Sequence, residues 1–179
     1  MEPQNQFVKS LISPETQEIA FKKLVADYKK RLYWHIRKIV IDHEDADDVL
    51  QNTFIKVFEN VNNFKGNSNI YTWMYKIATN ESLNFLGKKS RHLGISNEDW
   101  LKKKTANLES DVYFDGNAMQ LKFQKAIANL PEKQRLVFNM RYFEEMKYDK
   151  MSEIMETSVG GLKASYHHAV KKIKDMVNE

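Results

Sequence analysis

The sequence predicts an all-α protein made of two small helical modules. Apolar residues recur at three- and four-residue spacing through most of the chain, which is the period of an amphipathic helix. The 179 residues include only three prolines and six glycines, and no run shows the period-two alternation that indicates strands. Between Gly87 and Ala118 no period is sustained, so this stretch separates two helical parts.

The first helix is expected to begin at Ser13-Pro14, read as an N-cap followed by proline at the first helical position. Its apolar stripe is Phe21, Leu24, Val25, Tyr28, Leu32, Ile36 and Ile39. A second helix carries Ala46, Leu50, Thr53, Phe54, Val57 and Val61. The stretch "NNFKGNSN" ends it, because glycine and clustered asparagines favour a turn. Ser68 or Asn69 can then cap a third helix with Ile70, Met74, Ile77 and Ala78 inward.

Helical spacing returns at Met119. One helix carries Leu121, Ile127 and Leu130 and ends at Pro131, and the next carries Leu136, Val137, Met140 and Phe143. A short helix over 148–156 follows, and three residues later the final segment begins at Ser158. A short helix, a tight turn and a second helix indicate a helix-turn-helix.

The final helix is strongly two-sided at about 100° per residue. One face gathers Leu162, Tyr166, Ala169, Val170 and Ile173; the opposite face holds Lys163, Ala164, His167, His168, Lys171 and Lys174. In a helix-turn-helix the second helix enters the major groove, and the opening glycines would let the backbone approach a phosphate. An amphipathic surface helix with a solvated basic face explains the same pattern, and the pattern alone does not separate the two.

Composition excludes several classes of function. The chain has no cysteine, which removes disulfides, thiolate catalysis and cysteine-bound metal. No apolar run is long enough for a membrane span, and the first residues lack the pattern of a signal peptide, so we expect a cytoplasmic protein with no membrane insertion of its own. A net charge of +4 favours a polyanionic partner only modestly. We find no nucleophile–base pair, phosphate loop or metal cluster, and expect neither an enzyme nor a cofactor.

Two long segments resemble one family. The segment "LPEKQRLVFNMRYFEEMKYDKMSEIMETSVGGLKASYHHAVKKIK" is similar to region four of the extracytoplasmic-function sigma factors of the sigma-70 family. The segment "DADDVLQNTFIKVFENVNNFKGNSNIYTWMYKIATNESLNFLGKKSR" resembles their region two. Both occur in the family's order, with a linker between them.

The resemblance implies an alternative sigma factor that gives bacterial RNA polymerase its promoter preference. It predicts an N-terminal extension (1–12), region two (13–92), a linker (93–117) and region four (118–179). Region two would bind the beta-prime clamp helices and capture melted minus-ten DNA. Region four would bind the beta flap tip and read the minus-thirty-five element. An anti-sigma partner, by which the protein could be held at the membrane, is also expected.

The resemblance assigns polymerase binding to the second predicted helix, at Asp45, Asp48, Gln51, Asn52, Ile55 and Phe58. Acidic residues at a helix start would complement a basic clamp surface, and apolar positions off the core stripe would add contact area. Without the family match, the acidic run from Asp42 to Asp48 would be explained better by the helix dipole alone.

Capture of melted DNA needs flat rings for unstacked bases, amides for base edges and cations for the backbone. The family match assigns this role to Asn62, Phe64, Lys65, Asn67, Ser68, Trp73, Lys76, Asn80, Asn84, Lys88, Lys89 and Arg91. Phe64 and Trp73 could instead be core aromatics, with the asparagines serving only a turn.

The match also assigns minus-thirty-five contacts to Ser158, Gly160, Gly161, Lys163, Ala164, His167, His168 and Lys171. Here the sequence departs from the family, because two positions that are arginine in many members are Ser165 and His168. The bidentate contact from arginine to guanine is therefore missing, and the promoter letters cannot be taken from a typical member.

Two other classes of protein compete with this interpretation. A stand-alone helix-turn-helix regulator would never join polymerase, and its first half would sense or dimerise. A helical nuclease would use the acidic run for magnesium, but no second acidic cluster completes such a site.

Overall fold

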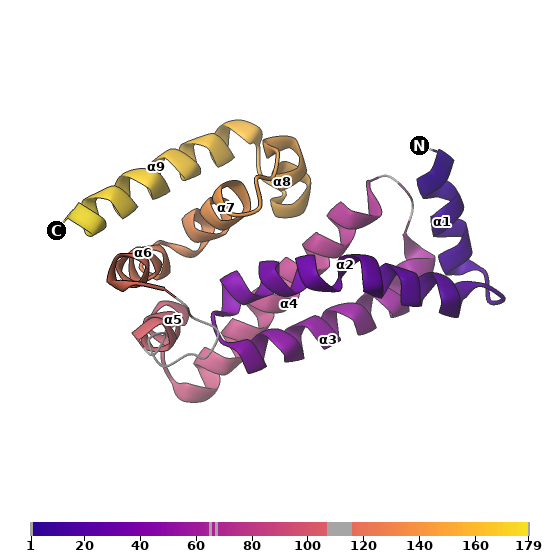
Figure 1. Cartoon of the computed structure of the whole chain (residues 1–179), viewed down its shortest axis with the longest axis horizontal. Coiled ribbons are helices and arrows are strands. Elements are labelled where there is room, and N and C mark those ends of the chain that lie inside the picture. The colour runs from indigo at the N-terminus through magenta and orange to yellow at the C-terminus, as the bar shows by residue number, and fades with distance from the viewer. Residues whose placement is uncertain (1, 65, 67, 107–115, 179) are drawn as a thin grey trace.

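The computed structural model describes residues 2–64, 66, 68–106 and 116–178, and every regular element among them is a helix. Figure 1 shows an elongated molecule in which α1 to α4 form one half and α5 to α9 lie along the other, with the two ends of the chain far apart. The prediction of an all-α fold is confirmed.

The first half is a bundle of three long helices, α2 (Gln17–Val40), α3 (His43–Asn60) and α4 (Ile70–Leu93), each packed against the other two. The predicted apolar stripes supply its core, and Leu32, Ile36, Val57 and Met74 are fully buried. A 3-10 turn, η1 (Val61–Asn63), follows α3. These helices position everything that the sequence assigns to region two.

The predicted N-cap at Ser13-Pro14 is wrong. Helix α1 (Glu2–Ile12) occupies part of the stretch described as an N-terminal extension, and its Leu11 is buried against the bundle. Ser13 and Pro14 lie in the turn between α1 and α2, where the backbone N–H of Gln17 donates to the Ser13 carbonyl. The turn hydrogen bonds make Thr16, rather than Ser13, the residue before α2.

Helix α4 has clear signals at both ends. Asn69 caps it, with its side-chain oxygen accepting from the N–H of Tyr71, as expected for one of the two predicted caps. At the other end Gly94 adopts φ +66, and the N–H of Ile95 donates to the Ser90 carbonyl. A left-handed glycine of this kind ends helices without steric penalty.

The expected absence of helical structure after Gly87 is also corrected. Helix α4 continues to Leu93, and α5 (Asn97–Ala106) lies within the predicted linker. Trp100 and Leu101 are buried, and the Trp100 ring has the ammonium groups of Lys89 and Lys104 at 5.1 and 5.0 Å from its centroid. Only a few apolar residues anchor this short helix, which explains why no period was visible.

The second half contains α6 (Ala118–Ala128), α7 (Glu132–Tyr142), α8 (Tyr148–Met155) and α9 (Val159–Asn178). Helices α6, α7 and α9 share a core whose buried residues are Ala126, Ile127, Leu130, Phe138, Ala169 and Ile173. The inward stripe predicted for the final helix is confirmed at Leu162, Ala169 and Ile173.

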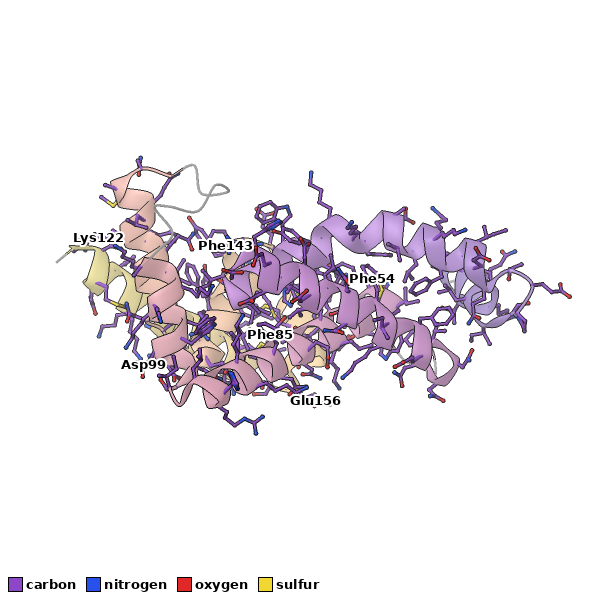
Figure 2. The ribbon with its side chains drawn as sticks, turned by 90° about the horizontal axis from the view of Figure 1, so that it is seen from below. Phe54, Phe85, Asp99, Lys122, Phe143 and Glu156 are labelled. Atoms are coloured by element: carbon purple, nitrogen blue, oxygen red, sulfur yellow. The ribbon has the colours of Figure 1, made fainter. Side chains whose placement is uncertain are left out.

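The halves pack directly on one another through α4 and α8, and through α2 and α7. Met151 and Ile154 of α8 belong to the same buried cluster as the first bundle. Figure 2 labels Phe143 and Glu156, two residues of the second half that contact the first. The ring centroid of Phe143 lies 5.5 Å from the Lys38 ammonium of α2. The carboxylate of Glu156 pairs with the ammonium of Lys76 of α4 at 2.7 Å. In the free chain the two halves are therefore in direct contact.

Candidate nucleic-acid interfaces

Helix α9 presents one exposed face away from its core. Lys163, Ala164, His167, His168 and Lys171 are all exposed. The two imidazole rings lie edge to face with centroids 5.9 Å apart. The assignment of these residues to minus-thirty-five DNA stays a prediction, but their common exposure is what such a contact requires.

The turn before α9 explains one of its two glycines. The N–H of Gly161 donates to the Ser158 hydroxyl at 3.2 Å, and a Cβ at Gly161 would lie 3.2 Å from that same oxygen. A side chain at Gly161 would therefore crowd the hydroxyl that caps this turn. A Cβ at Gly160 would meet nothing within 4 Å, so that position is open to a phosphate and has no packing reason to be glycine.

A polar groove lies between the end of α3 and one face of α4. It encloses about 440 Å³ and is lined by Lys56, Asn60, Asn63, Trp73, Ile77, Asn80, Glu81 and Asn84. An indole, several amides and a cation in one hollow are the groups that hold unstacked bases and their backbone. The structure therefore brings together Trp73, Asn80 and Asn84 among the predicted minus-ten residues.

Lys56, Asn60 and Asn63 were missed by the sequence interpretation. They sit at the C-terminal end of α3 and in η1, where Asn60 donates to the Lys56 carbonyl at 2.8 Å. The signal was present, because positions 56, 60 and 63 follow helical spacing. It could be recognised only once the pairing of α3 with α4 was known.

Phe64 occupies a different place from the one expected. It is 8% exposed and its ring centroid lies 5.1 Å from that of Trp73. Phe64 is therefore a core aromatic, which was the alternative left open by the sequence, and its ring packs against that of Trp73. Trp73 itself is half-buried and lines the groove. It therefore packs partly into the core and also presents part of its ring to the groove.

The other residues predicted for melted DNA lie outside the groove. Asn62, Lys88 and Arg91 are exposed and Ser68 is half-buried; Lys65 and Asn67 lie outside the described residues. Lys76 is engaged with Glu156 at 2.7 Å. The groove thus joins only part of the predicted set.

Asp45 and Lys89 form an ion pair with each other. Asp45 is 4% exposed, so its carboxylate does not face outward as the predicted contact with polymerase requires. Its backbone N–H donates to Asp42 at 3.1 Å, which caps α3. Burial by itself would raise the pKa of Asp42. The ammonium of Lys104 at 2.6 Å and the N–H of Asp45 outweigh this effect, so the pKa of Asp42 lies below its ordinary value. The acidic run therefore stabilises the helix start and its contact with α5.

The remaining residues predicted to bind polymerase share an exposed face of α3. Asp48, Gln51 and Asn52 are exposed, and Ile55 and Phe58 are 54% and 46% exposed. Phe58 packs edge-on against Phe21, with ring centroids 5.1 Å apart. Exposed apolar side chains beside polar ones are typical of a protein contact surface.

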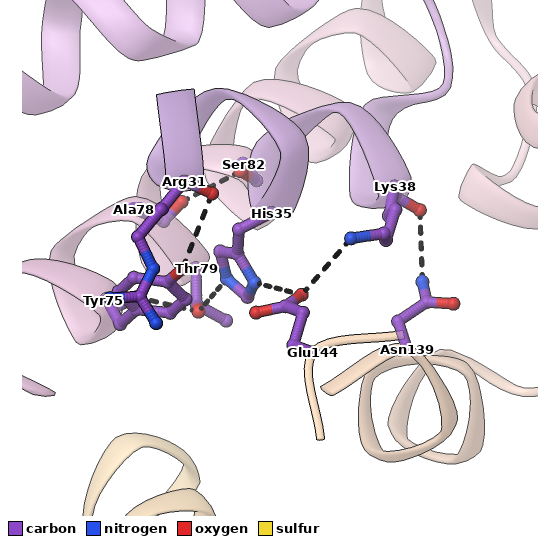
Figure 3. A network of polar contacts seen from close by, with 9 residues as sticks. All are labelled: Arg31, His35, Lys38, Tyr75, Ala78, Thr79, Ser82, Asn139 and Glu144. Atoms are coloured by element: carbon purple, nitrogen blue, oxygen red, sulfur yellow. Dashed lines mark hydrogen bonds and ion pairs between the residues drawn. The ribbon is translucent and has the colours of Figure 1, made fainter. Parts of the chain in front are cut away.

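A buried polar network joins the two halves (Figure 3). His35 of α2 contacts Glu144 at 3.0 Å through Nδ1 and Thr79 of α4 at 2.9 Å through Nε2. Asn139 of α7 donates to the Lys38 carbonyl at 3.1 Å. Burial raises the pKa of Glu144, but the charges of His35, Lys38 and Arg31 and the His35 hydrogen bond hold it below its ordinary value. No local sequence pattern indicates this network, because its members are far apart in the chain.

Comparison with known proteins decides the family. The sequence profile of Sigma-70 region 2 matches residues 24–92, and that of Sigma-70, region 4 matches residues 120–173. The chain is 30% identical over 169 residues to the "ECF RNA polymerase sigma-E factor" of Haemophilus influenzae, covering 88% of this chain and 87% of that protein. The chain belongs to the ECF family of RNA polymerase sigma factors.

Other relatives of this sigma factor agree. It is 30% identical over 162 residues to the "RNA polymerase sigma-H factor" of Pseudomonas aeruginosa, covering 86% of the chain and 84% of that protein. Its fold matches that of CnrH, solved in complex with the cytosolic domain of CnrY, with a TM-score of 0.69, 18% identity and coverage of 98% and 97%. It matches the sigma factor RpoE of Bartonella quintana, solved with the anti-sigma factor NepR, with a TM-score of 0.67, 18% identity and coverage of 88% and 96%.

The protein is therefore an alternative sigma factor that directs transcription initiation, as the sequence predicted, and a stand-alone regulator is not favoured. Among the described residues, no helix is long and apolar enough to cross a membrane. Within the same residues, no cluster of histidine and acidic side chains could hold a metal ion.

Proposed function

We propose that the α3–α4 groove captures the melted minus-ten strand and that the exposed face of α9 reads the minus-thirty-five duplex. The observation that carries the first assignment is the groove itself, which gathers Trp73, Asn80 and Asn84 in a hollow of about 440 Å³. A base that leaves the duplex costs a few kcal/mol, offset by stacking and by amide hydrogen bonds.

The basic face of α9 supports the second assignment. Its Lys163 and Lys171 are placed to follow a phosphate chain, while Ala164 leaves room for a base edge. The first turn of the helix contains Gly160, a position with open space around it, where backbone N–H groups can meet a phosphate. Ser165 and His168, which stand where many family members have arginine, make recognition depend less on bidentate guanine contacts.

The expected partners are core RNA polymerase, promoter DNA and an anti-sigma factor. The exposed face of α3 with Ile55 and Phe58 fits the clamp-helix contact, and region four would take the flap tip. The solved relatives bound to CnrY and NepR support an anti-sigma partner. The cytosolic part of CnrY in one of them favours a cytoplasmic location here. No step of covalent chemistry is assigned to this chain, in keeping with a family of initiation factors.

Trp73→Ala tests the groove. We expect this variant to co-migrate with core polymerase in gel filtration but to open promoter DNA poorly, because the melted strand loses its stacking partner. Permanganate footprinting measures the opened region. Trp73→Tyr should restore much of the opening, since a flat ring is retained over Phe64; an unchanged bubble with Trp73→Ala would remove the groove from the mechanism.

A further inference from the structure

One face of α2 carries an aromatic ring between pairs of cations. Lys30, Arg31, Arg37 and Lys38 stand four and three residues before, and three and four residues after, Trp34. That spacing places all of them on one side of a helix. The Trp34 side chain is 46% exposed. None of these residues belongs to the groove, to the α9 face or to the exposed face of α3.

Two hollows flank the Trp34 indole. One, of about 390 Å³, is lined by Lys30, Arg31, Trp34, Lys38, Tyr71, Tyr75, Phe143 and Glu144. The other, of about 200 Å³, is lined by a mixture of apolar and polar side chains that come mostly from α2, α6 and α7. Trp34, Lys38 and Phe143 line both. The indole therefore stands as a ridge with space for a flat group on either side, and Tyr33 packs edge-on against it at 5.4 Å.

The charges around this ridge are positive. The Arg31 guanidinium lies 4.8 Å from the centroid of Tyr71, and the Lys150 ammonium of α8 lies 5.4 Å from the same centroid. Among the residues that line the two hollows, one is acidic: Glu144, which lines the larger hollow. Its side chain is only 10% exposed and is already engaged by His35. A ligand that enters the hollows therefore meets cations and rings first.

We propose that this face of α2, with Trp34 at its centre, is a further binding site for single-stranded nucleic acid. Trp34 would stack an unpaired base, the flanking hollows would take its neighbours, and Lys30, Arg31 and Arg37 would meet the phosphates. The cationic stretch from Lys30 to Lys38 rises about 12 Å along the helix, which suits a short run of nucleotides. Duplex DNA keeps its base faces covered and could use only the charges.

The site goes beyond the proposed promoter contacts, because it lies on α2 and uses neither Trp73 nor α9. DNA and RNA strands share the chemistry that this face recognises. An acidic protein segment would also be attracted to the cations, but it has no need of the two ring-sized hollows beside an exposed indole.

The test uses the full chain with oligothymidylate and oligouridylate eight nucleotides long, each carrying one 5-iodouracil. We expect photo-cross-linking to Trp34, mapped by mass spectrometry, with both strands or with one, which identifies the preferred source. Trp34→Ala should weaken binding in fluorescence anisotropy by about fivefold or more. Trp73→Ala should leave the Trp34 cross-link in place, so failure of the minus-ten groove and failure of this site are distinguishable.

Charge variants give a second readout. Lys30→Gln with Arg31→Gln should reduce the slope of log affinity against log salt by about 1.4, the value for two lost phosphate contacts on a single strand. Lys22→Gln with Lys23→Gln is the matched control, because these exposed lysines lie on the same helix in ion pairs with Glu18 and Asp27. Equal effects of the two pairs, or no Trp34 cross-link, would overturn the proposal. Loss of core polymerase binding by Trp34→Ala with oligonucleotide affinity unchanged would overturn it too and identify a protein contact.

Discussion

The α9 face and the α3–α4 groove, the two surfaces proposed to bind DNA, both carry cations, but the free chain holds those cations differently. Lys163 and Lys171 on α9 are exposed and, in the part of the chain that the structure describes, form no ion pair. In and around the groove Lys56 pairs with Glu81 at 2.6 Å, and Lys76 pairs with Glu156 at 2.7 Å. In the proposed roles, duplex binding by α9 would break no ion pair of Lys163 or Lys171, whereas strand capture by Lys56 and Lys76 would displace carboxylates.

This difference suits the order of the two events. A duplex element is present before polymerase arrives, so a surface with exposed charges can engage it at once and is steered by salt-dependent attraction. A melted strand exists only after opening. Cations that are held by carboxylates until then cannot be occupied by duplex phosphates, and Glu156 belongs to the half that carries α9 itself.

The largest expected effect is on the α9 face. Lys163→Ala with His167→Ala should reduce run-off transcription from a promoter that depends on its minus-thirty-five element by about tenfold or more, since two groove contacts are lost. Lys122→Ala, an exposed lysine on α6, is the control. Unchanged transcripts from the double variant would show that α9 does not lie in the major groove.

The polar network between the halves should give the next largest effect. Glu144→Gln should lower the free energy of unfolding at pH 7 by about 2 kcal/mol, because a buried charged hydrogen bond is lost. The pKa of Glu144 is held below its ordinary value, so its stabilisation is present above that value and disappears as pH falls through the lowered pKa.

Urea unfolding at pH 7 and at successively lower pH measures this effect. The difference between the native chain and Glu144→Gln should shrink in acid below about pH 4. Glu145→Gln, at the exposed neighbouring position, should change little at any pH. A difference for Glu144→Gln that stays constant with pH would mean that its charge does not hold the halves together.

The smallest effect concerns the pair that spans the halves. Glu156→Gln should raise the affinity for single-stranded minus-ten DNA roughly two- to threefold, because Lys76 is released from an exposed ion pair of modest strength. Anisotropy at low and high salt measures it, and the gain should vanish at about 1 M salt. Glu153→Gln on α8 is the control. A gain that persists at high salt would have another origin than charge.

Helical periodicity predicted most of the fold, because long stripes such as Leu32 to Ile39 need only the local sequence. The helix caps were less predictable. Asn69 was one of two neighbouring candidates and does cap α4. Ser13 and Pro14, predicted to begin a helix, lie instead in the turn between α1 and α2. Helix α5 was hidden because Trp100 is fixed by Lys89 and Lys104, which are tertiary contacts.

The candidate sites were likewise predictable where one helix defines them and not where tertiary contacts do. The α9 face could be derived from one helix, and all of its outward residues are exposed. The groove required two helices, so Trp73 and Asn80 were found through the family match while Asn60 and Asn63 were missed. Asp45 and Lys89 were assigned to separate partners, although the fold joins them to each other. Pairings of residues 44 positions apart leave no local pattern.

Transcription from a promoter whose minus-ten region is pre-melted by mismatches tests the division of labour most directly. With reconstituted holoenzyme, we expect pre-melting to restore most of the activity lost by Trp73→Ala and none of that lost by Lys163→Ala with His167→Ala. Equal rescue of both variants, or rescue of the α9 variant alone, would contradict separate surfaces for the melted strand and the duplex.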